Sequence, residues 1–395
     1  MAKLIYADNA ATTQVKPEVL EAMLPYFKEE FGNPSSLYKF AYPPKKAIAK
    51  ARAQVAALLG AEENEIYFTG CGTESDNWAI KGTAAALGDK KGKHIITSKI
   101  EHHAVIRTCE YLEKKGFEVT YLDVDEFGMI SIEELKAAIR KDTILISIMF
   151  ANNEIGTIEP ISEMGRIARE NKILFHTDAV QAAGHVPIDV RDMNIDMLSM
   201  SGHKLGTPKG IGVLYMKKGV VIDSLIHGGG HERGRRSGTE NVPYIVGLGV
   251  AAQLAMEKLD ANVRKITAMR DRLIDGALKL PYTILTGHRT ARLPGIASIC
   301  VEGIEGESLL LNMYNAGVCA SSGSACSSGS LDPSHVLLSI GLPHHIAHGS
   351  LRLSLGESNT EEDVDNILAA LDEVVSRLRK MSPVWENNKP AWHND

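Results

Sequence analysis

Apolar residues near the start of the chain recur at the spacing of a helix. Within residues 17–31, Leu20, Met23, Leu24 and Phe27 occupy positions i, i+3, i+4 and i+7. This spacing places the four side chains on one face of a helix. The pattern therefore predicts an amphipathic helix over this segment.

From residue 66 onward, short apolar runs alternate with helix-like segments such as residues 104–115 and 133–140. Alternation of strand and helix predicts an α/β fold, with a mostly parallel sheet that carries helices on both faces. Ligands bind beyond the carboxyl ends of the strands in such sheets, so the residues after each run are candidate site residues. The runs are EIYF, HIIT, FEVTYLDV, TILISIMF, ILFHT, DMLSM and GIGVLYM.

The alternation ends near residue 259, where we expect a domain boundary. A helical stretch over residues 262–280 leads there into two shorter strands, ASICVEG and LRLSL. A long helix is predicted over residues 360–380, because it opens with the capping box Thr360-x-x-Asp363 and has one apolar face. The last residues, SPVWENNKPAWHND, contain two prolines and no periodicity, and are interpreted as a tail or docking segment.

Charge and hydropathy exclude several classes of protein. The chain has 395 residues, with 43 Lys+Arg against 49 Asp+Glu, which gives a net charge of −6. This balance argues against nucleic-acid binding. The longest apolar run, residues 144–151, is far shorter than the roughly 20 residues of a membrane span. The start of the chain lacks the apolar core of a signal peptide. We therefore expect a soluble, cytoplasmic protein with no membrane partner.

The five cysteines do not form a recognisable structural set. Their odd number and the absence of a C-x-x-C pair argue against a disulfide framework and a zinc ribbon. Four of them lie in or beside apolar runs and are interpreted as buried: Cys71, Cys109, Cys300 and Cys319. Cys326 differs, because it lies in SSGSACSSGS, a run of small residues that favours a mobile loop over about residues 321–332.

Charged or hydroxyl residues follow three of the predicted strands. Lys204 follows DMLSM, Asp178 follows ILFHT, and Thr73 follows EIYFTGC. Partial burial of a lysine lowers its pKa and suits it to Schiff-base chemistry. A neighbouring acid can pair with a protonated pyridine nitrogen, and a helix start can hold a phosphate. Together these residues indicate a pyridoxal phosphate site. Taken singly, Lys204 could be a solvated surface residue, and Asp178 and Thr73 could be helix N-caps.

Short motifs of distinctive composition recur along the chain. They are YADNAATT (6–13), FGNPSS (31–36), GTES (72–75), EHHAV (101–105), NNEIG (152–156), HTDAVQ (176–181), SGHK (201–204), HGGGHERGRRSGT (227–239), SSGSAC (321–326) and RLSLG (352–356). In order and spacing, up to about residue 385, they resemble the motifs of NifS/IscS-type cysteine desulfurases. The resemblance implies a fold-type-I pyridoxal phosphate enzyme. Its large cofactor-binding domain would be residues 14–259, and its smaller α+β domain would be residues 1–13 and 260–395.

The resemblance also implies a role for individual residues in holding the cofactor. Lys204 would bond covalently to pyridoxal phosphate as a Schiff base, and Asp178 would pair with the pyridine nitrogen. Gln181 would bond the phenolate oxygen, and His102 would lie on the ring face. The family is homodimeric, so Thr239 would reach the phosphate from the partner subunit. The phosphate ligands within one subunit would be Gly72, Thr73, Ser201 and His203.

The same resemblance implies L-cysteine as the substrate. Asn153 and Arg352 would bind its carboxylate, Arg352 through a planar two-pronged contact that lysine cannot make. The Cys326 thiolate would attack the substrate sulfur, leaving a persulfide on Cys326 and releasing L-alanine. The sulfur would then pass to an iron–sulfur scaffold protein. The sequence departs from the family pattern at Tyr38, near the expected substrate entrance, and at Gly206-Thr207, which follow Lys204.

Other functions stay open at this point. A selenocysteine lyase or another enzyme of the same fold would share the cofactor residues. A non-enzymatic iron–sulfur or metal carrier would use Cys326 as a ligand together with histidines. The histidine pairs His227/His231 and His344/His348 have i, i+4 spacing, but neither pair has the glutamate of an H-E-x-x-H site. We therefore expect no metal site.

Overall fold

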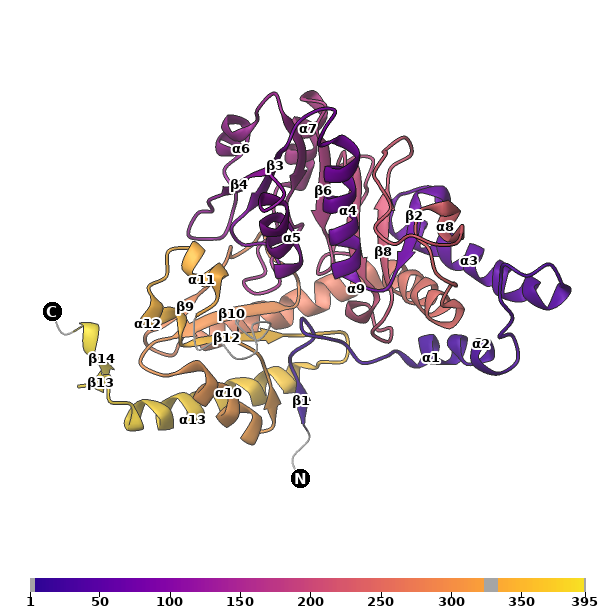
Figure 1. The fold of residues 1–395 in the computed structure, drawn as a ribbon. Helices are drawn as coiled ribbons and strands as arrows, with labels where there is room; N and C mark the ends of the chain where they lie inside the picture. Colours follow the sequence, from indigo (N-terminus) through magenta and orange to yellow (C-terminus); the bar gives the residue numbers. More distant parts are fainter. Residues whose placement is uncertain (1–3, 323–332, 394–395) are drawn as a thin grey trace.

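The computed structural model describes residues 4–322 and 333–393. Its main sheet has the strand order β2-β8-β7-β6-β5-β3-β4 (Figure 1). Neighbouring strands run parallel, except that β8 is antiparallel to both β2 and β7. The mostly parallel α/β class is thereby confirmed, and each strand falls on one of the predicted apolar runs. The strands are β2 (Ile66–Thr69), β3 (His94–Ser98), β4 (Glu118–Leu122), β5 (Thr143–Ser147), β6 (Leu174–Asp178), β7 (Met197–Ser201) and β8 (Gly212–Met216).

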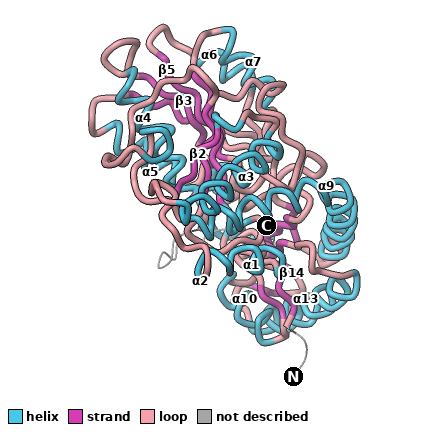
Figure 2. Tube along the Cα trace, turned by 90° about the vertical axis from the view of Figure 1, so that its right-hand side faces the viewer, coloured by secondary structure: helices cyan, strands magenta, loops and turns pink. Residues whose placement is uncertain are grey.

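Helices cover both faces of this sheet because its strands are apolar on both faces. Successive side chains of a strand point to opposite faces. Ile95 thus packs in one buried cluster with Trp78, while its neighbour Ile96 packs in another with Phe175. Figure 2 shows the sheet between these helical layers. The main helices are α3 (Tyr42–Leu59), α4 (Gly72–Leu87), α5 (His103–Glu113), α6 (Ile132–Ala138), α7 (Ile161–Glu170) and α9 (Val242–Ala277).

A second, smaller sheet has the antiparallel order β12-β10-β9. Beside it, the N-terminal strand β1 pairs in parallel with β11. The capping box at Thr360 and Asp363 is present at the start of α13, as predicted. The elements of this part are β1 (Ile5–Tyr6), β9 (Thr283–Leu285), β10 (Ile296–Val301), α10 (Gly306–Asn315), β11 (Val318–Cys319), β12 (Ser350–Ser354) and α13 (Glu361–Met381).

Helix α9 contributes to two of the buried clusters of apolar residues, one in each half of the molecule. Ala252 of α9 belongs to the cluster under the main sheet, whereas Leu273 belongs to the cluster that also contains Ile5 and Leu351. The helix runs without a break through residue 259. We propose on this basis that the domains are residues 14–259, and residues 1–13 with 260–395, joined within one continuous helix.

The amphipathic helix predicted over residues 17–31 differs from the structure. It is divided into α1 (Pro17–Met23) and α2 (Pro25–Lys28), because Pro25 has no N–H with which to continue the helical hydrogen bonds. Val19 and Met23 are the buried residues. Of the predicted apolar face, only Met23 is buried, whereas Leu20, Leu24 and Phe27 are exposed, Phe27 to 53%. These three residues belong to an exposed apolar arm, at the right of Figure 1, made of Leu20, Leu24, Phe27, Phe31, Leu37, Tyr38 and Phe40.

The C-terminal residues up to 393 form a small hairpin that packs on the second domain. Trp385 lies against the guanidinium of Arg379, 4.1 Å from the ring centre.

Among the described residues, no helix is long and apolar enough to cross a membrane. The remaining elements are short: α8 (His231–Gly234), α11 (His335–Ser339), α12 (His344–Ala347), β13 (Trp385–Glu386), β14 (Lys389–Pro390), and the 3-10 helices η1 (Lys39–Ala41), η2 (Glu63–Glu65), η3 (Gly202–Lys204) and η5 (Ala391–His393).

Candidate active site

The start of α4 lies close to the ends of β6 and β7. A Cβ atom on Gly72 would lie 2.6 Å from Val180 Cγ2 and 3.4 Å from Ser201 Cβ, so only glycine fits at this approach. Cys71, the N-cap of α4, makes no side-chain cap hydrogen bond. The first amides of a helix favour an anion, and here they include those of Gly72 and Thr73. This helix start is therefore suited to a phosphate.

Lys204 lies directly after β7, in η3. Its Nζ donates hydrogen bonds to the carbonyl oxygens of Ala10 and Ala11, the latter at 2.8 Å. Gln181 Nε2 donates to the same Ala10 carbonyl at 2.9 Å. Two predicted cofactor residues thus meet on the backbone of the YADNAATT motif, although Gln181 and Lys204 lie 171 and 194 positions from Ala10 in the sequence.

Asp178 is a buried carboxylate at the end of β6. It is 6% exposed, and its Oδ1 accepts a hydrogen bond from the Val180 N–H at 2.9 Å. Burial raises the pKa of Asp178, while the charges of His102 and Lys204 act in the opposite direction. A further positive charge next to this carboxylate would stabilise its ionised form. A protonated pyridine nitrogen is such a charge.

The two predicted histidines are held in fixed orientations. His102 caps α5, where its Nδ1 accepts the Ala104 N–H at 3.1 Å, so Nε2 carries the proton of the neutral ring. His203 Nδ1 lies 3.1 Å from the Thr12 hydroxyl oxygen. Burial and the charge of Lys204 lower the pKa of His203 to about 4, so this ring is neutral near pH 7.

Arg352 is buried in β12, where it is 3% exposed. Its Nη1 donates to the Asn153 carbonyl at 2.9 Å, and its Nη2 forms an ion pair with Asp8 Oδ1 at 3.1 Å. Its Nε is buried and has no hydrogen-bond partner within the described part of the chain. A buried donor without a partner is costly, and an entering carboxylate would supply one. Asp8 was missed in the sequence analysis, although it lies in a quoted motif.

Cys326 lies outside the described residues. The chain that leads toward it is hydrogen-bonded beside the arginine, because the Arg352 N–H donates to the Ser321 carbonyl at 2.7 Å. Thr239 is exposed in the segment between α8 and α9. That segment is anchored within its own subunit by an ion pair between Arg236 and Glu74 at 2.8 Å. The reach of Thr239 to a partner's phosphate stays a prediction.

The other cysteines agree only partly with expectation. Cys109 and Cys300 are buried, and burial raises the pKa of both thiols, that of Cys300 to about 12. Cys319 is half-buried, and Cys71 is exposed. The prediction of a buried Cys71 was wrong, because the residue stands at the N-cap of α4, where the chain leaves the sheet. No cluster of three or more potential metal ligands occurs in residues 4–322 and 333–393.

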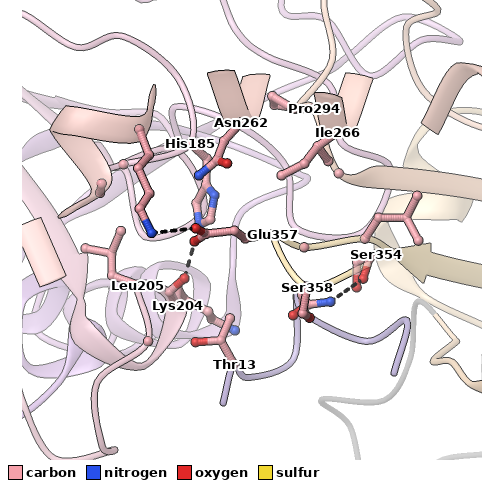
Figure 3. A pocket seen from close by; sticks show the side chains of 18 of the residues that line it. Thr13, His185, Lys204, Leu205, Asn262, Ile266, Pro294, Ser354, Glu357 and Ser358 are labelled. Atoms are coloured by element: carbon pink, nitrogen blue, oxygen red, sulfur yellow. Dashed lines mark hydrogen bonds and ion pairs between the residues drawn. The ribbon is translucent and has the colours of Figure 1, made fainter. Parts of the chain in front are cut away.

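A cavity of about 470 Å³ borders Lys204 and Gln181 (Figure 3). Glu357 lies at this cavity and forms ion pairs with Lys16 at 2.8 Å and Lys258 at 2.9 Å. Gly206, one of the positions that depart from the family pattern, also lines it. Its φ of +88° favours glycine, and a Cβ atom there would lie 2.7 Å from Lys16 Cγ.

Comparison with known proteins agrees with this geometry. Residues 5–367 match the model of the family described as Aminotransferase class-V. The chain is 63% identical over 382 residues to a cysteine desulfurase IscS of Methanosarcina thermophila, covering 97% of this chain and 94% of that protein. It is 59% identical over 390 residues to a cysteine desulfurase IscS of Clostridium botulinum, covering 98% of each.

Solved structures give the same result. The structure of a NifS-like protein matches with a TM-score of 0.89 and 41% sequence identity. The match covers 95% of this chain and 100% of that one. A structure of SspA in complex with cysteine has a TM-score of 0.78 and 40% identity, covering 90% of this chain and 100% of that one. The fold and site thus define a fold-type-I, pyridoxal-phosphate-dependent enzyme. Within that class, the chain belongs to the cysteine desulfurases of the aminotransferase class-V family.

The residues present fit pyridoxal phosphate on structural grounds. The glycine at the start of α4 leaves room for a close approach by an anion, and the buried Asp178 suits a cationic ring nitrogen. Lys204 provides an amine at the same edge of the sheet, because the neighbouring parallel strands β6 and β7 end at Asp178 and shortly before Lys204. The start of α4, Asp178 and Lys204 thus suit the three groups by which the cofactor is bound, which are its phosphate, its ring nitrogen and its aldehyde.

Proposed function

We propose that this enzyme converts L-cysteine to L-alanine, holds the sulfur as a persulfide on Cys326, and passes it to a scaffold protein for iron–sulfur cluster assembly. One observation carries the proposal. The segment of residues 8–11 contacts Arg352 through Asp8 and Lys204 through the Ala10 and Ala11 carbonyls. A group for binding a carboxylate and a group for binding a cofactor are thus held by four consecutive residues, as an α-amino acid substrate requires.

Each cofactor residue has a defined task in this proposal. Bound pyridoxal phosphate supplies an electron sink. Lys204 would hold it covalently, and Asp178 would keep a proton on the ring nitrogen. Gln181 would bond the phenolate oxygen, and His102 would lie on the ring face. Gly72, Thr73, Ser201 and His203 would hold the phosphate, together with Thr239 of the partner subunit.

Sulfur passes from the thiol of the substrate L-cysteine to the thiol of Cys326. Arg352 binds the substrate carboxylate, assisted by Asn153, and so fixes the substrate for attack. The thiolate of Cys326 forms a bond to the substrate sulfur, and the carbon–sulfur bond breaks with its electron pair staying on the carbon. Protonation of that carbon gives alanine. The thiol and L-cysteine are thereby converted to a persulfide and L-alanine, with no external oxidant or reductant.

The exposed apolar arm supports a homodimer. Leu37 is 95% exposed and Phe31 is 68% exposed, and the ring of Phe40 packs on that of Phe31 with their centres 5.1 Å apart. Contiguous apolar surface of this kind marks a protein interface. A second copy of the chain is the proposed occupant, because the partner subunit must also bring its Thr239 to the phosphate.

Replacement of Cys326 tests the proposed function. In Cys326→Ala, the cofactor residues are unchanged, so the absorption spectrum of the loaded enzyme should still change on mixing with L-cysteine. Alanine formation and alkylation-trapped persulfide should fall to background, because the sulfur acceptor is lost. Cys319→Ala is the matched control and should retain activity, since Cys319 is half-buried in β11. Normal alanine production by Cys326→Ala would contradict the proposal.

A further inference from the structure

The turn of residues 152–156 lies between Arg352 and helix α11. It is built on Asn152, whose Oδ1 accepts the N–H groups of Glu154 at 2.8 Å and Ile155 at 2.9 Å. The Asn152 side chain also donates to the Ile100 carbonyl at 2.9 Å. The base of the turn is therefore fixed to the large domain.

Glu154 joins this turn to α11. Its Oε2 accepts a hydrogen bond from the hydroxyl of Ser334. Ser334 is the N-cap of α11, where its oxygen accepts the Val336 N–H at 3.1 Å. Glu154 is 6% exposed and Ser334 is 5% exposed. A buried carboxyl group that loses its partner costs free energy, so this contact strongly restricts where the turn and the helix can lie.

The residue next to Glu154 contacts the substrate-binding arginine. The Asn153 carbonyl accepts a hydrogen bond from Arg352 Nη1 at 2.9 Å. On the other side of Glu154, Ile155 packs in a buried cluster with Val336 and Leu337 of α11. A shift of the turn relative to α11 would therefore move an acceptor that orients Arg352.

We propose that Glu154 is a positioning residue: by holding the turn against α11, it sets the direction in which Arg352 presents its guanidinium to the substrate carboxylate. The inference rests on the proposed function, since it assigns Arg352 to that carboxylate. The inference goes beyond the proposed function because it gives a role to Glu154 and Ser334, two residues that the proposed reaction does not use.

Binding measurements on the loaded enzyme test this role. Glu154→Ala and Ser334→Ala should each weaken binding of L-cysteine and of the product L-alanine about tenfold, by the usual value of a hydrogen bond to a charged group. Both ligands carry the α-carboxylate, so they should be affected equally. Binding is followed by the change in cofactor absorption, and cofactor content should stay unchanged. The double variant should bind the amino acids as tightly as the weaker-binding of the two single variants, because both changes remove the same contact.

Two further variants separate positioning from general destabilisation. Glu154→Gln should restore binding to near the original value, because its amide oxygen can accept the Ser334 hydroxyl. Glu126→Ala is the control, since Glu126 is exposed. In the protein without cofactor, amide exchange at Val336 should be faster in Glu154→Ala than in Glu154→Gln. This measurement needs neither cofactor nor substrate.

The possible outcomes are distinct. Normal amino-acid binding in Glu154→Ala and Ser334→Ala overturns the inference, as does a Glu154→Gln variant that binds as weakly as the alanine variant. If Glu154→Ala does not fold, the comparison of Ser334→Ala with Glu154→Gln decides the question. Failure of the unmodified enzyme to form alanine from L-cysteine would instead contradict the proposed function, whatever the variants do.

Discussion

Arg352 shows how a single buried side chain can define a substrate. Its guanidinium is surrounded by the Asn153 carbonyl and the Asp8 carboxylate, and its Nε has no partner within the described residues. Only one negative charge among these partners balances the cation, so a second carboxylate can enter without leaving the site strongly anionic. The planar arrangement of its donors suits that carboxylate better than a single ammonium would.

We expect Arg352→Lys to weaken L-cysteine binding ten- to a hundred-fold, since a hydrogen bond to a charged group contributes about 1.5–3 kcal/mol. The charge is kept while the two-pronged geometry is lost. Titration of the loaded enzyme with L-cysteine measures the change, and cofactor content should not alter. Arg377→Lys, on the exposed side of α13, is the control. Unchanged affinity in Arg352→Lys would exclude the carboxylate contact.

Among the elements, α13 has the start that is best defined by local sequence. Thr360 Oγ1 accepts the Asp363 N–H at 3.1 Å, and Asp363 Oδ2 accepts the Thr360 N–H at 3.1 Å. Val364, Ile367 and Leu371 of this helix pack in the buried cluster that also contains Ile5 and Leu351. Its start therefore affects the packing of the smaller domain.

Loss of this cap should be measurable. Thr360→Ala should lower the free energy of unfolding by about 1 kcal/mol, because an N-cap hydroxyl is removed. Thr360→Ser keeps the hydroxyl and should behave like the original protein. Urea denaturation gives the midpoint, and hydrogen exchange at the first turn of α13 localises the effect. An unchanged midpoint in Thr360→Ala would show that the cap contributes little here.

At the scale of the whole molecule, Glu357 connects segments that are distant in sequence. It follows β12 and pairs with Lys16, which precedes α1, and with Lys258 of α9. Burial acts to raise its pKa, but the hydrogen bonds from Lys16 and Lys258 outweigh it and lower the pKa of Glu357 to about 2. Because the folded pKa lies below the unfolded value, its stabilisation is complete above about pH 4.5 and is lost as the pH falls toward 2.

Glu357→Gln should therefore destabilise the protein at pH 7 and have less effect in acid. We expect about 1 kcal/mol at pH 7, a modest value because the side chain is 36% exposed and solvent screens the ion pairs. The Tm of the variant and of the original protein should converge as the pH is lowered from 5 to 3. A constant difference over that range would exclude Glu357 titration as the cause.

The exposed arm gives a second prediction for the whole molecule. Leu37→Asp should weaken the proposed dimer at least about tenfold, since burial of a leucine side chain contributes about 1.5–3 kcal/mol. Sedimentation velocity over a range of concentrations measures the shift toward monomer. Phe127→Asp is the control, because Phe127 is 43% exposed and lies outside the arm. A dimer of unchanged stability in Leu37→Asp would place the interface elsewhere.

The sequence by itself determined the strands of the main sheet, the cap of α13, and the family motifs that name Lys204, Asp178 and Arg352. Each of these depends on residues that are close together in the sequence. They are the spacing of apolar residues, a side chain that bonds the backbone N–H three residues away, and short sequence motifs. Local patterning failed at the start of the chain, where it could not show that Phe27 faces solvent.

Only the tertiary structure decided which distant residues meet. Asp8 reaches Arg352 across 344 positions, and Ser334 reaches Glu154 across 180. No periodicity encodes such pairs, because they arise when separate elements pack and each buried polar group must find a partner near it. The chemical groups of this enzyme could thus be read from its sequence, while packing determined their partners, their burial and therefore their pKa values.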